Sequence, residues 1–230
     1  MIARLCGLAT LLLFLAVPAH GADLGSLTDK IQKQYQSLTS FTADFNQVLK
    51  NASSKQEENR TGRLSFAQPA LIRWETEKPE KEILVVGKDA VWNAFEDEKT
   101  AYRYAVEDVL GSKTMLRFLS GQGNLKVDFH ISEEQGAPKG QVKLKLVPKE
   151  AEPSLVLAYA WVDTANFMLA RIAIEDFYGN VNDVTLSTVK MNPSLSKNLF
   201  QYSPPKGFEI FDNTAAASPA GTGAPKGKKQ

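Results

Sequence analysis

Residues 62–95 constrain the fold of this chain most, because they hold four short alternating runs between turn residues. Leu64 and Phe66 alternate with polar neighbours in one run, and Ile72 and Trp74 do so in the next. Side chains that alternate with a period of two lie on opposite faces of a strand. Turn residues separate the runs, at 68–70, 78–80 and 87–89. The stretch therefore predicts an antiparallel meander with one apolar face.

The rest of the chain repeats this strand pattern around two predicted helices. Leu27, Ile31 and Tyr35 recur at helical spacing within residues 24–38, which predicts an amphipathic helix. A second, short helix is predicted at 112–120, with Ser112 as its N-cap. Residues 51–60 are polar and predict a loop. Further strands are predicted at 41–47, 100–106, 125–131, 142–146, 155–162, 169–177 and 184–189, with residues 200–205 closing the fold.

These patterns predict an α+β fold with one curved antiparallel sheet. The count is about ten strands and two helices, which is near the upper size of an open sheet. Residues 155–162 are apolar almost throughout, which predicts a strand covered on both faces. Residues 169–177 and 184–189 are joined through a Tyr-Gly-Asn turn, which is a hairpin signal. No internal repeat or second-domain boundary is found, so residues 22–213 are predicted to form one domain.

Both ends of the chain are predicted to lie outside this domain. Residues 1–21 have a basic start, an apolar run and small residues near position 21, as a cleaved secretory signal peptide does. The protein is therefore expected in the periplasm. Residues 214–230 are small, basic and rich in Pro and Gly, which predicts disorder.

The composition of the mature chain speaks against several classes of enzyme. Removing residues 1–21 takes away the only cysteine and one of the two histidines. The remaining His130 falls on the polar face of an alternating strand, where a solvated side chain is expected. No nucleophile elbow, phosphate loop or dinucleotide fingerprint is present. The acidic pairs at 57–58 and 133–134 fall in polar stretches and are expected to be solvated, so we predict neither an enzyme nor a metal site.

The apolar face of the sheet leaves two interpretations open. Alternation of this kind is what any half-buried sheet shows, so the face is either filled by an ordinary core or is the wall of a pocket. The short apolar helix predicted at 112–120 favours the second interpretation, because such a helix is not stable in water without a surface to cover.

Four stretches together resemble a known family, the LolA outer-membrane lipoprotein carriers. They are Leu38–Gln47 after the first helix, Gly62–Phe66 with Pro69 and Arg73-Trp74, Pro79 followed by 82–86 and Val91-Trp92, and the closing 200–208. The resemblance covers nearly all of residues 24–213. It implies an incomplete β-barrel, in which one curled antiparallel sheet encloses an apolar cavity covered by α-helices.

The resemblance also implies a function that needs no covalent chemistry and no cofactor. A carrier of this family takes triacylated lipoproteins from an inner-membrane ABC transporter, shields their acyl chains and passes them to an outer-membrane receptor or to the outer membrane. It is expected to be a monomer that binds no nucleic acid. The residues expected to contact lipid are Ile31, Tyr35, Phe45, Leu64, Phe66, Ile72, Trp74, Leu84, Val86, Trp92, Met115, Leu116 and Leu119.

One position departs from the family pattern. Well-studied family members carry an arginine before the proline that is Pro69 here, and that arginine holds the closed lid. This chain has Gln68, which can still donate to a backbone carbonyl but without a charge. Gln68 is therefore the expected gating residue, and Arg73 is a candidate to replace the missing charge. Two other functions stay open: a carrier or sensor of another lipid or amphiphile on the same fold, and an envelope hydrolase without a visible motif.

Overall fold

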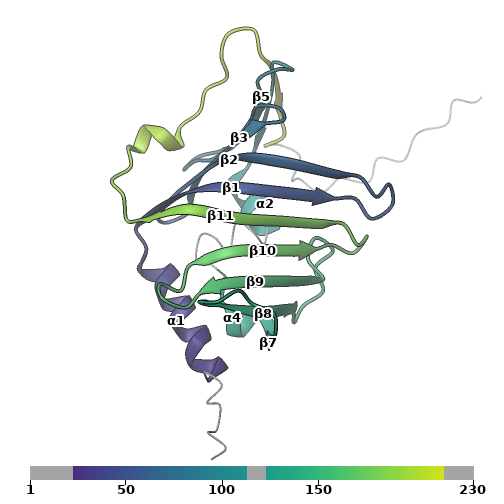
Figure 1. The fold of residues 1–230 in the computed structure, drawn as a ribbon. Coiled ribbons are helices and arrows are strands. Elements are labelled where there is room, and N and C mark those ends of the chain that lie inside the picture. Colours follow the sequence, from purple (N-terminus) through teal and green to yellow (C-terminus); the bar gives the residue numbers. More distant parts are fainter. Residues whose placement is uncertain (1–22, 113–122, 215–230) are drawn as a thin grey trace, which may run out of the picture.

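The structure, a computed structural model, describes residues 23–112 and 123–214 and is dominated by one twelve-stranded sheet (Figure 1). The strands are β1 (Ser40–Lys50), β2 (Glu57–Ala67), β3 (Leu71–Lys78), β4 (Glu82–Val86), β5 (Val91–Phe95), β6 (Thr100–Tyr104), β7 (Phe129–Glu134), β8 (Gln141–Pro148), β9 (Leu157–Asp163), β10 (Leu169–Glu175), β11 (Val181–Met191) and β12 (Glu209–Asp212). The helices are α1 (Leu24–Ser37), α2 (Val106–Ser112), α4 (Leu125–Asp128) and the 3₁₀ turn η1 (Lys197–Phe200). The α+β class and the single curled sheet predicted from the sequence are confirmed.

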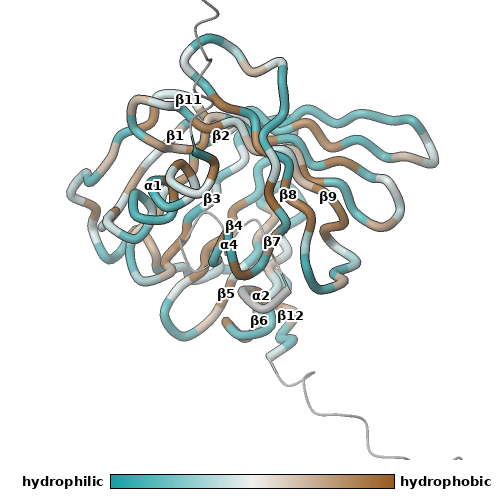
Figure 2. Tube along the Cα trace, turned by 90° about the horizontal axis from the view of Figure 1, so that it is seen from below, coloured by the Kyte–Doolittle hydropathy of each residue, from teal (hydrophilic) through white to brown (hydrophobic). Residues whose placement is uncertain are grey.

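The strand order divides the sheet into two limbs that meet at β1 and β11. It runs β12-β6-β5-β4-β3-β2-β1-β11-β10-β9-β8-β7, and every pair is antiparallel except β12 with β6. The pairing of β1 with β11 joins the β2–β6 limb to the β7–β10 limb. Figure 2 shows the sheet bending back from β1 and β11 towards β5 and β6, with α2 and α4 on the side towards which it bends. Strands β7 and β12 are the two edges, so the sheet is curled but not closed.

The register of the β1–β6 meander places its apolar side chains in rows on the inner, concave face. Phe41 of β1 lies opposite Phe66 of β2, which lies opposite Ile72 of β3. The same row continues through Val86 and Val91. All five side chains are at most 1% exposed and belong to the central apolar cluster. The alternation seen in the sequence therefore predicted this face correctly.

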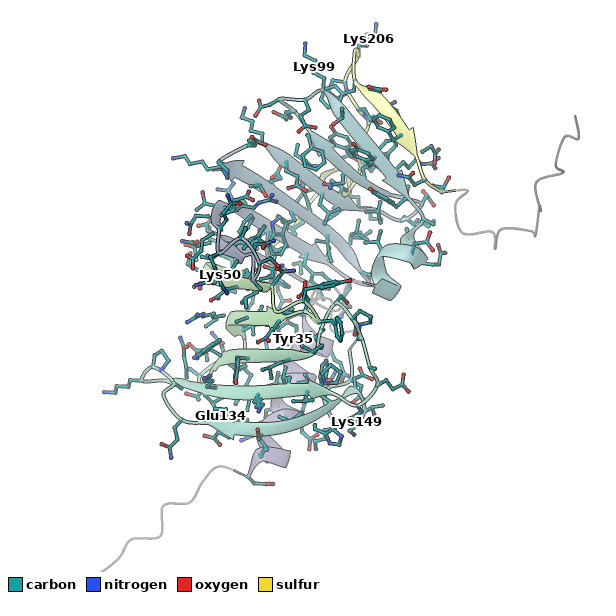
Figure 3. All side chains as sticks on the ribbon, turned by 90° about the vertical axis from the view of Figure 1, so that its right-hand side faces the viewer. Tyr35, Lys50, Lys99, Glu134, Lys149 and Lys206 are labelled. Atoms are coloured by element: carbon teal, nitrogen blue, oxygen red, sulfur yellow. The ribbon has the colours of Figure 1, made fainter. Side chains whose placement is uncertain are left out.

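Helix α1 covers the inner face from the β7–β11 side. The Asp23 side chain caps it by accepting hydrogen bonds from the backbone N–H groups of residues 25 and 26. Its apolar stripe is buried in the cluster, and the Tyr35 hydroxyl (labelled in Figure 3) accepts a hydrogen bond from the backbone N–H of Leu169 at 3.0 Å. The Gln32 side chain accepts from the backbone N–H of Leu125 at 3.2 Å, which ties α1 to α4. The helix predicted at 24–38 is thus confirmed.

The C-terminal segment covers the outer face of the β2–β6 limb. Trp92 directly follows Val91 in β5, so its ring points to the face opposite the inner row. Its ring centroid lies 6.2 Å from that of Tyr202. Arg73 points to the same face and donates to the carbonyl of Leu199 at 3.2 Å. The outer face of this limb is therefore packed under η1 and the residues after it.

Several predicted elements differ from the structure at their ends. The loop predicted at 51–60 is shorter, because β2 already begins at Glu57. The strand predicted at 125–131 begins only at Phe129, because Asn124 accepts a hydrogen bond from the Val127 N–H and starts the helical turn α4. The apolar Val127 side chain is consequently 63% exposed.

Three further predictions about the elements need correction or lie outside the described residues. Strand β9 is covered fully on one face only, because its burial alternates between buried and half-buried residues. The chain does not end its fold at 200–205, since β12 adds to the edge of β6. Ser112 is the last described residue of α2, and residues 113–120 of the predicted helix lie outside the described part of the chain.

Candidate functional site

A cavity of about 950 Å³ opens between the two limbs of the sheet, at the end where β1 finishes and β2 begins. Lys50, labelled in Figure 3, marks this end. Its walls come from the ends of the β1, β3 and β10 strands and the starts of β2, β4 and β11. The volume lies within the range of about 300–1,000 Å³ that is usual for small-molecule sites.

The floor of this cavity is apolar and continues the inner face of the sheet. Trp74 is 8% exposed, and its ring centroid lies 4.6 Å from that of Phe45. Leu84 of β4 lies opposite Trp74 of β3 in the strand pairing. Ile174 of β10 contributes from the opposite limb. The cavity is therefore the open end of the same apolar trough whose deeper part is filled by the packed side chains of the sheet and α1.

The mouth of the cavity is polar and charged. The Arg60 guanidinium donates to Glu58 at 2.7 Å and to Glu82 at 2.7 Å. Burial would lower the pKa of Arg60, but its hydrogen bonds and charge interactions with the two carboxylates outweigh this and raise that pKa. Gln47, 9% exposed, donates to Asn182 at 2.9 Å and links β1 to β11 at the same end. An apolar tail could thus lie on the floor while a polar group meets these residues.

Most of the residues expected to contact lipid lie together on the inner face. Those in the central apolar cluster are Ile31, Tyr35, Phe45, Leu64, Phe66, Ile72, Trp74 and Val86, and Leu84 packs against it. Of this set, only Trp74 and Leu84 also line the open cavity. The others are covered, so a ligand that reached them would have to displace packed side chains.

Other expected site residues lie elsewhere. Trp92 and Arg73 face the outer side, because each is one residue removed from an inner-face residue of its strand. Gln68 lies in the turn between β2 and β3 and donates to the carbonyl of Gln36 in the last turn of α1, at 3.1 Å. Met115, Leu116 and Leu119 lie outside the described residues.

The charged mouth of the cavity was not predicted from the sequence. Glu58 was expected in a loop, but it lies on β2, where its side chain stays exposed and pairs with Arg60. The signal was present in the alternation of Arg60, Gly62 and Leu64, which extends the strand backwards from residue 62. The pairing of Arg60 with Glu82, 22 residues away, becomes visible only once β3 lies between β2 and β4.

Within residues 23–112 and 123–214 no group of three or more His, Cys, Asp or Glu side chains is placed to hold a metal ion. His130 lies exposed on β7, as its position in the sequence predicted. None of the helices in the described ranges has the length and apolar character needed to cross a bilayer.

An unclosed, curled sheet with an apolar concave face and a helical cover defines a class of incomplete-barrel binding proteins. The sequence identifies the family within this class. Residues 36–203 match the family described as "Outer membrane lipoprotein carrier protein LolA", and the chain belongs to that family.

Individual relatives agree with this assignment. An outer-membrane lipoprotein carrier protein of Methylococcus capsulatus is 27% identical over 184 residues, covering 80% of this chain and 86% of the relative. One of Nitrosomonas europaea is 26% identical over 198 residues, covering 86% and 92%. An uncharacterized conserved protein from Thermus thermophilus shares the fold, with a TM-score of 0.54 at 15% identity over 82% of this chain and 98% of the other.

Proposed function

We propose that this protein is a periplasmic chaperone that binds the acyl chains of lipoproteins between the two limbs of its sheet. The observation that carries the proposal is the apolar inner face that ends in an open cavity, floored by Trp74, Leu84 and Ile174. Exposing an acyl chain to water costs about 0.8 kcal/mol per CH₂, so a carrier needs an extended apolar surface of this kind. Membership of the lipoprotein-carrier family supports the same cargo.

The route that we propose follows from the family. The carrier accepts a triacylated lipoprotein from an inner-membrane ABC transporter and delivers it to a receptor in the outer membrane or to that membrane itself. Residues 1–21 would direct export as a signal peptide. No covalent step is needed, because delivery requires only that the acyl chains bind and leave.

Binding would begin at the open end of the trough and proceed inwards. The first methylenes would contact Trp74 and Leu84, which already line the cavity. Longer chains would reach the row that includes Phe66 and Ile72 only if the helical cover moves away. Helix α1 is one part of that cover, and its C-terminal turn is tied to the sheet by the Gln68–Gln36 hydrogen bond.

Site-specific photocrosslinking in living cells tests this function. A photoreactive residue at Leu84, on the floor, should trap lipoproteins. The matched control is Lys143, on the opposite face of the sheet in β8, where its ammonium lies 4.3 Å from the ring centroid of Tyr159. Capture of lipoproteins at both positions, or of free lipid alone at Leu84, would contradict lipoprotein carriage, and the second result would favour a carrier of another lipid.

A further inference from the structure

We propose that the mouth of the cavity selects against lipids with an anionic headgroup, with Glu82 and Glu58 as the specificity-determining residues. The inference rests on the proposed function, because it concerns which acylated molecules the same cavity accepts. It predicts that a diacyl lipid with an uncharged polar end binds better than a phospholipid with the same chains and a net negative charge.

The residues that line the cavity carry a net negative charge. Four of them are carboxylates and two are cations, which gives a formal charge of −2. The carboxylates are Glu57, Glu58, Glu82 and Asp176, and the cations are Lys50 and Arg60. A negative lining repels a phosphate, and the repulsion is stronger here than in bulk water because the site is partly desolvated.

Both cations already form ion pairs with carboxylates of the same lining. Lys50 lies 2.9 Å from Glu57, and Arg60 is held between Glu58 and Glu82. The Arg60 side chain is only 27% exposed and that of Glu82 only 19%, so their pairing is protected from water. A phosphate that approached Arg60 would have to compete with two carboxylates already at hydrogen-bond distance.

Glu82 lies directly beyond the apolar floor on the same strand as Leu84. Glu82 and Leu84 are two residues apart on β4 and point to the same face. Two residues of a strand span about 7 Å, so the carboxylate lies one step beyond the Trp74–Leu84 pair. When acyl chains lie on the floor with their polar end towards the opening, that end meets Glu82 first.

A negative mouth whose cations are already paired suits the lipid end of a triacylated lipoprotein. It consists of esters, a thioether and an amide, none of which carries a charge. A phosphatidylglycerol with the same chains carries a phosphate at the corresponding place. The mouth would therefore admit lipoproteins while excluding the anionic lipids of the membranes between which a carrier works.

Binding of two soluble short-chain probes to the purified protein tests the inference. The probes are an N-acetylated, C-terminally amidated dihexanoylglyceryl-cysteine peptide without charged side chains, and dihexanoyl phosphatidylglycerol. Binding is measured by displacement of an apolar fluorophore. Wild type should bind the neutral probe at least about tenfold more tightly, and this preference should shrink as salt is raised.

Two variants test whether the carboxylates of the mouth cause the preference for the neutral probe. Glu82→Gln and, separately, the more exposed Glu58→Gln should each raise the affinity for phosphatidylglycerol relative to the neutral probe by on the order of tenfold. Glu133→Gln, which removes an exposed carboxylate on β7, is the matched control and should leave this ratio unchanged.

The outcomes separate the inference from the function on which it rests. Equal binding of both probes to wild type, a preference for phosphatidylglycerol, or an unchanged ratio in both mouth variants would overturn the selectivity alone. Failure of wild type to bind either probe would overturn the proposed acyl-chain binding, and the selectivity with it.

Discussion

The hydrogen bond between Gln68 and α1 offers a direct way to change how firmly the helical cover is held. The Gln68 amide donates to the carbonyl of Gln36 at 3.1 Å, at the exposed C-terminal end of the helix. That end has no basic residue in its last turn, although a cation there would interact favourably with the helix dipole. Gln68→Arg should therefore replace a neutral hydrogen bond with a charge-assisted one at the same place.

The expected magnitude follows from the two kinds of hydrogen bond. A neutral one contributes about 1 kcal/mol and one to a charged group about 1.5–3 kcal/mol. The difference between them is about 0.5–2 kcal/mol, and because the site is exposed we expect a gain in its lower part, about 0.5–1.5 kcal/mol. If the bond breaks before the ligand leaves, release should slow roughly 2- to 13-fold. Gln68→Ala, which removes the bond, should speed release by about fivefold.

The assay is the rate at which a fluorescent acylated peptide moves from the loaded protein to acceptor vesicles. Gln135→Arg adds the same charge in the exposed turn between β7 and β8 and controls for a general effect of charge on vesicle contact. Equal release rates for wild type, Gln68→Arg and Gln68→Ala would refute the idea that this hydrogen bond restrains the cover. A rate that slowed equally in Gln135→Arg would assign the effect to net charge.

Three further predictions concern stability and ligand response. Tyr35→Phe should lower the free energy of unfolding, measured by urea titration, by about 1–3 kcal/mol, because the buried Leu169 N–H loses its acceptor. An apolar probe should shift the tryptophan fluorescence through Trp74, so Trp74→Phe should lose the shift and Trp92→Phe should keep it. The side-chain and backbone hydrogen bonds of Thr214, with that of Arg103, hold the pKa of Asp212 at about 2, below its unfolded value near 4. The stabilisation is therefore present above about pH 4 and lost as the pH falls through 2, so protection of the β12 amides from hydrogen exchange should decline in that window.

Each of these three predictions has a control variant or an outcome that would contradict it. Tyr178→Phe removes the hydroxyl of a tyrosine that is 76% exposed, and should change the unfolding free energy by less than about 0.5 kcal/mol. A fluorescence shift that survives in Trp74→Phe would place the probe away from the cavity floor. Asp212→Asn should abolish the acid-dependent loss of β12 protection, and an unchanged pH profile in that variant would assign the loss to other groups.

How far the sequence predicts this fold depends on whether an element is specified by its own residues. The inner row through Phe66, Ile72 and Val86 follows from alternation and short turns, so it could be derived. Strand β12 could not, because its four residues are all exposed and show no alternation of burial. It is held by pairing with β6 and by the stacking of Phe211 on Tyr102, with ring centroids 5.0 Å apart. These contacts join residues that are far apart in the chain.

The candidate site depends even more strongly on contacts between residues that are far apart in the chain. Alternation identifies Trp74 as inward-facing but cannot say whether it meets a neighbour or an opening, because a packed core and a pocket have the same pattern. The presence of Ile174 in the same cavity distinguishes the pocket from a packed core. Ile174 reaches that cavity only because β1 pairs with β11. Which residues stay open to a ligand is therefore a property of the curvature of the sheet and of its cover.

The charged mouth depends on a close approach of two strands that a single glycine permits. Gly62 lies at a register shift between β2 and β3, and a Cβ there would stand 1.8 Å from the carbonyl oxygen of Glu75. Only glycine permits this approach of the two backbones. Arg60 shares a face of β2 with Gly62, and the same cross-strand row runs through Thr76 to Glu82. The glycine thus lets β3 lie close enough for Arg60 to reach across it, which fixes one ion pair where the apolar floor ends and the polar mouth begins.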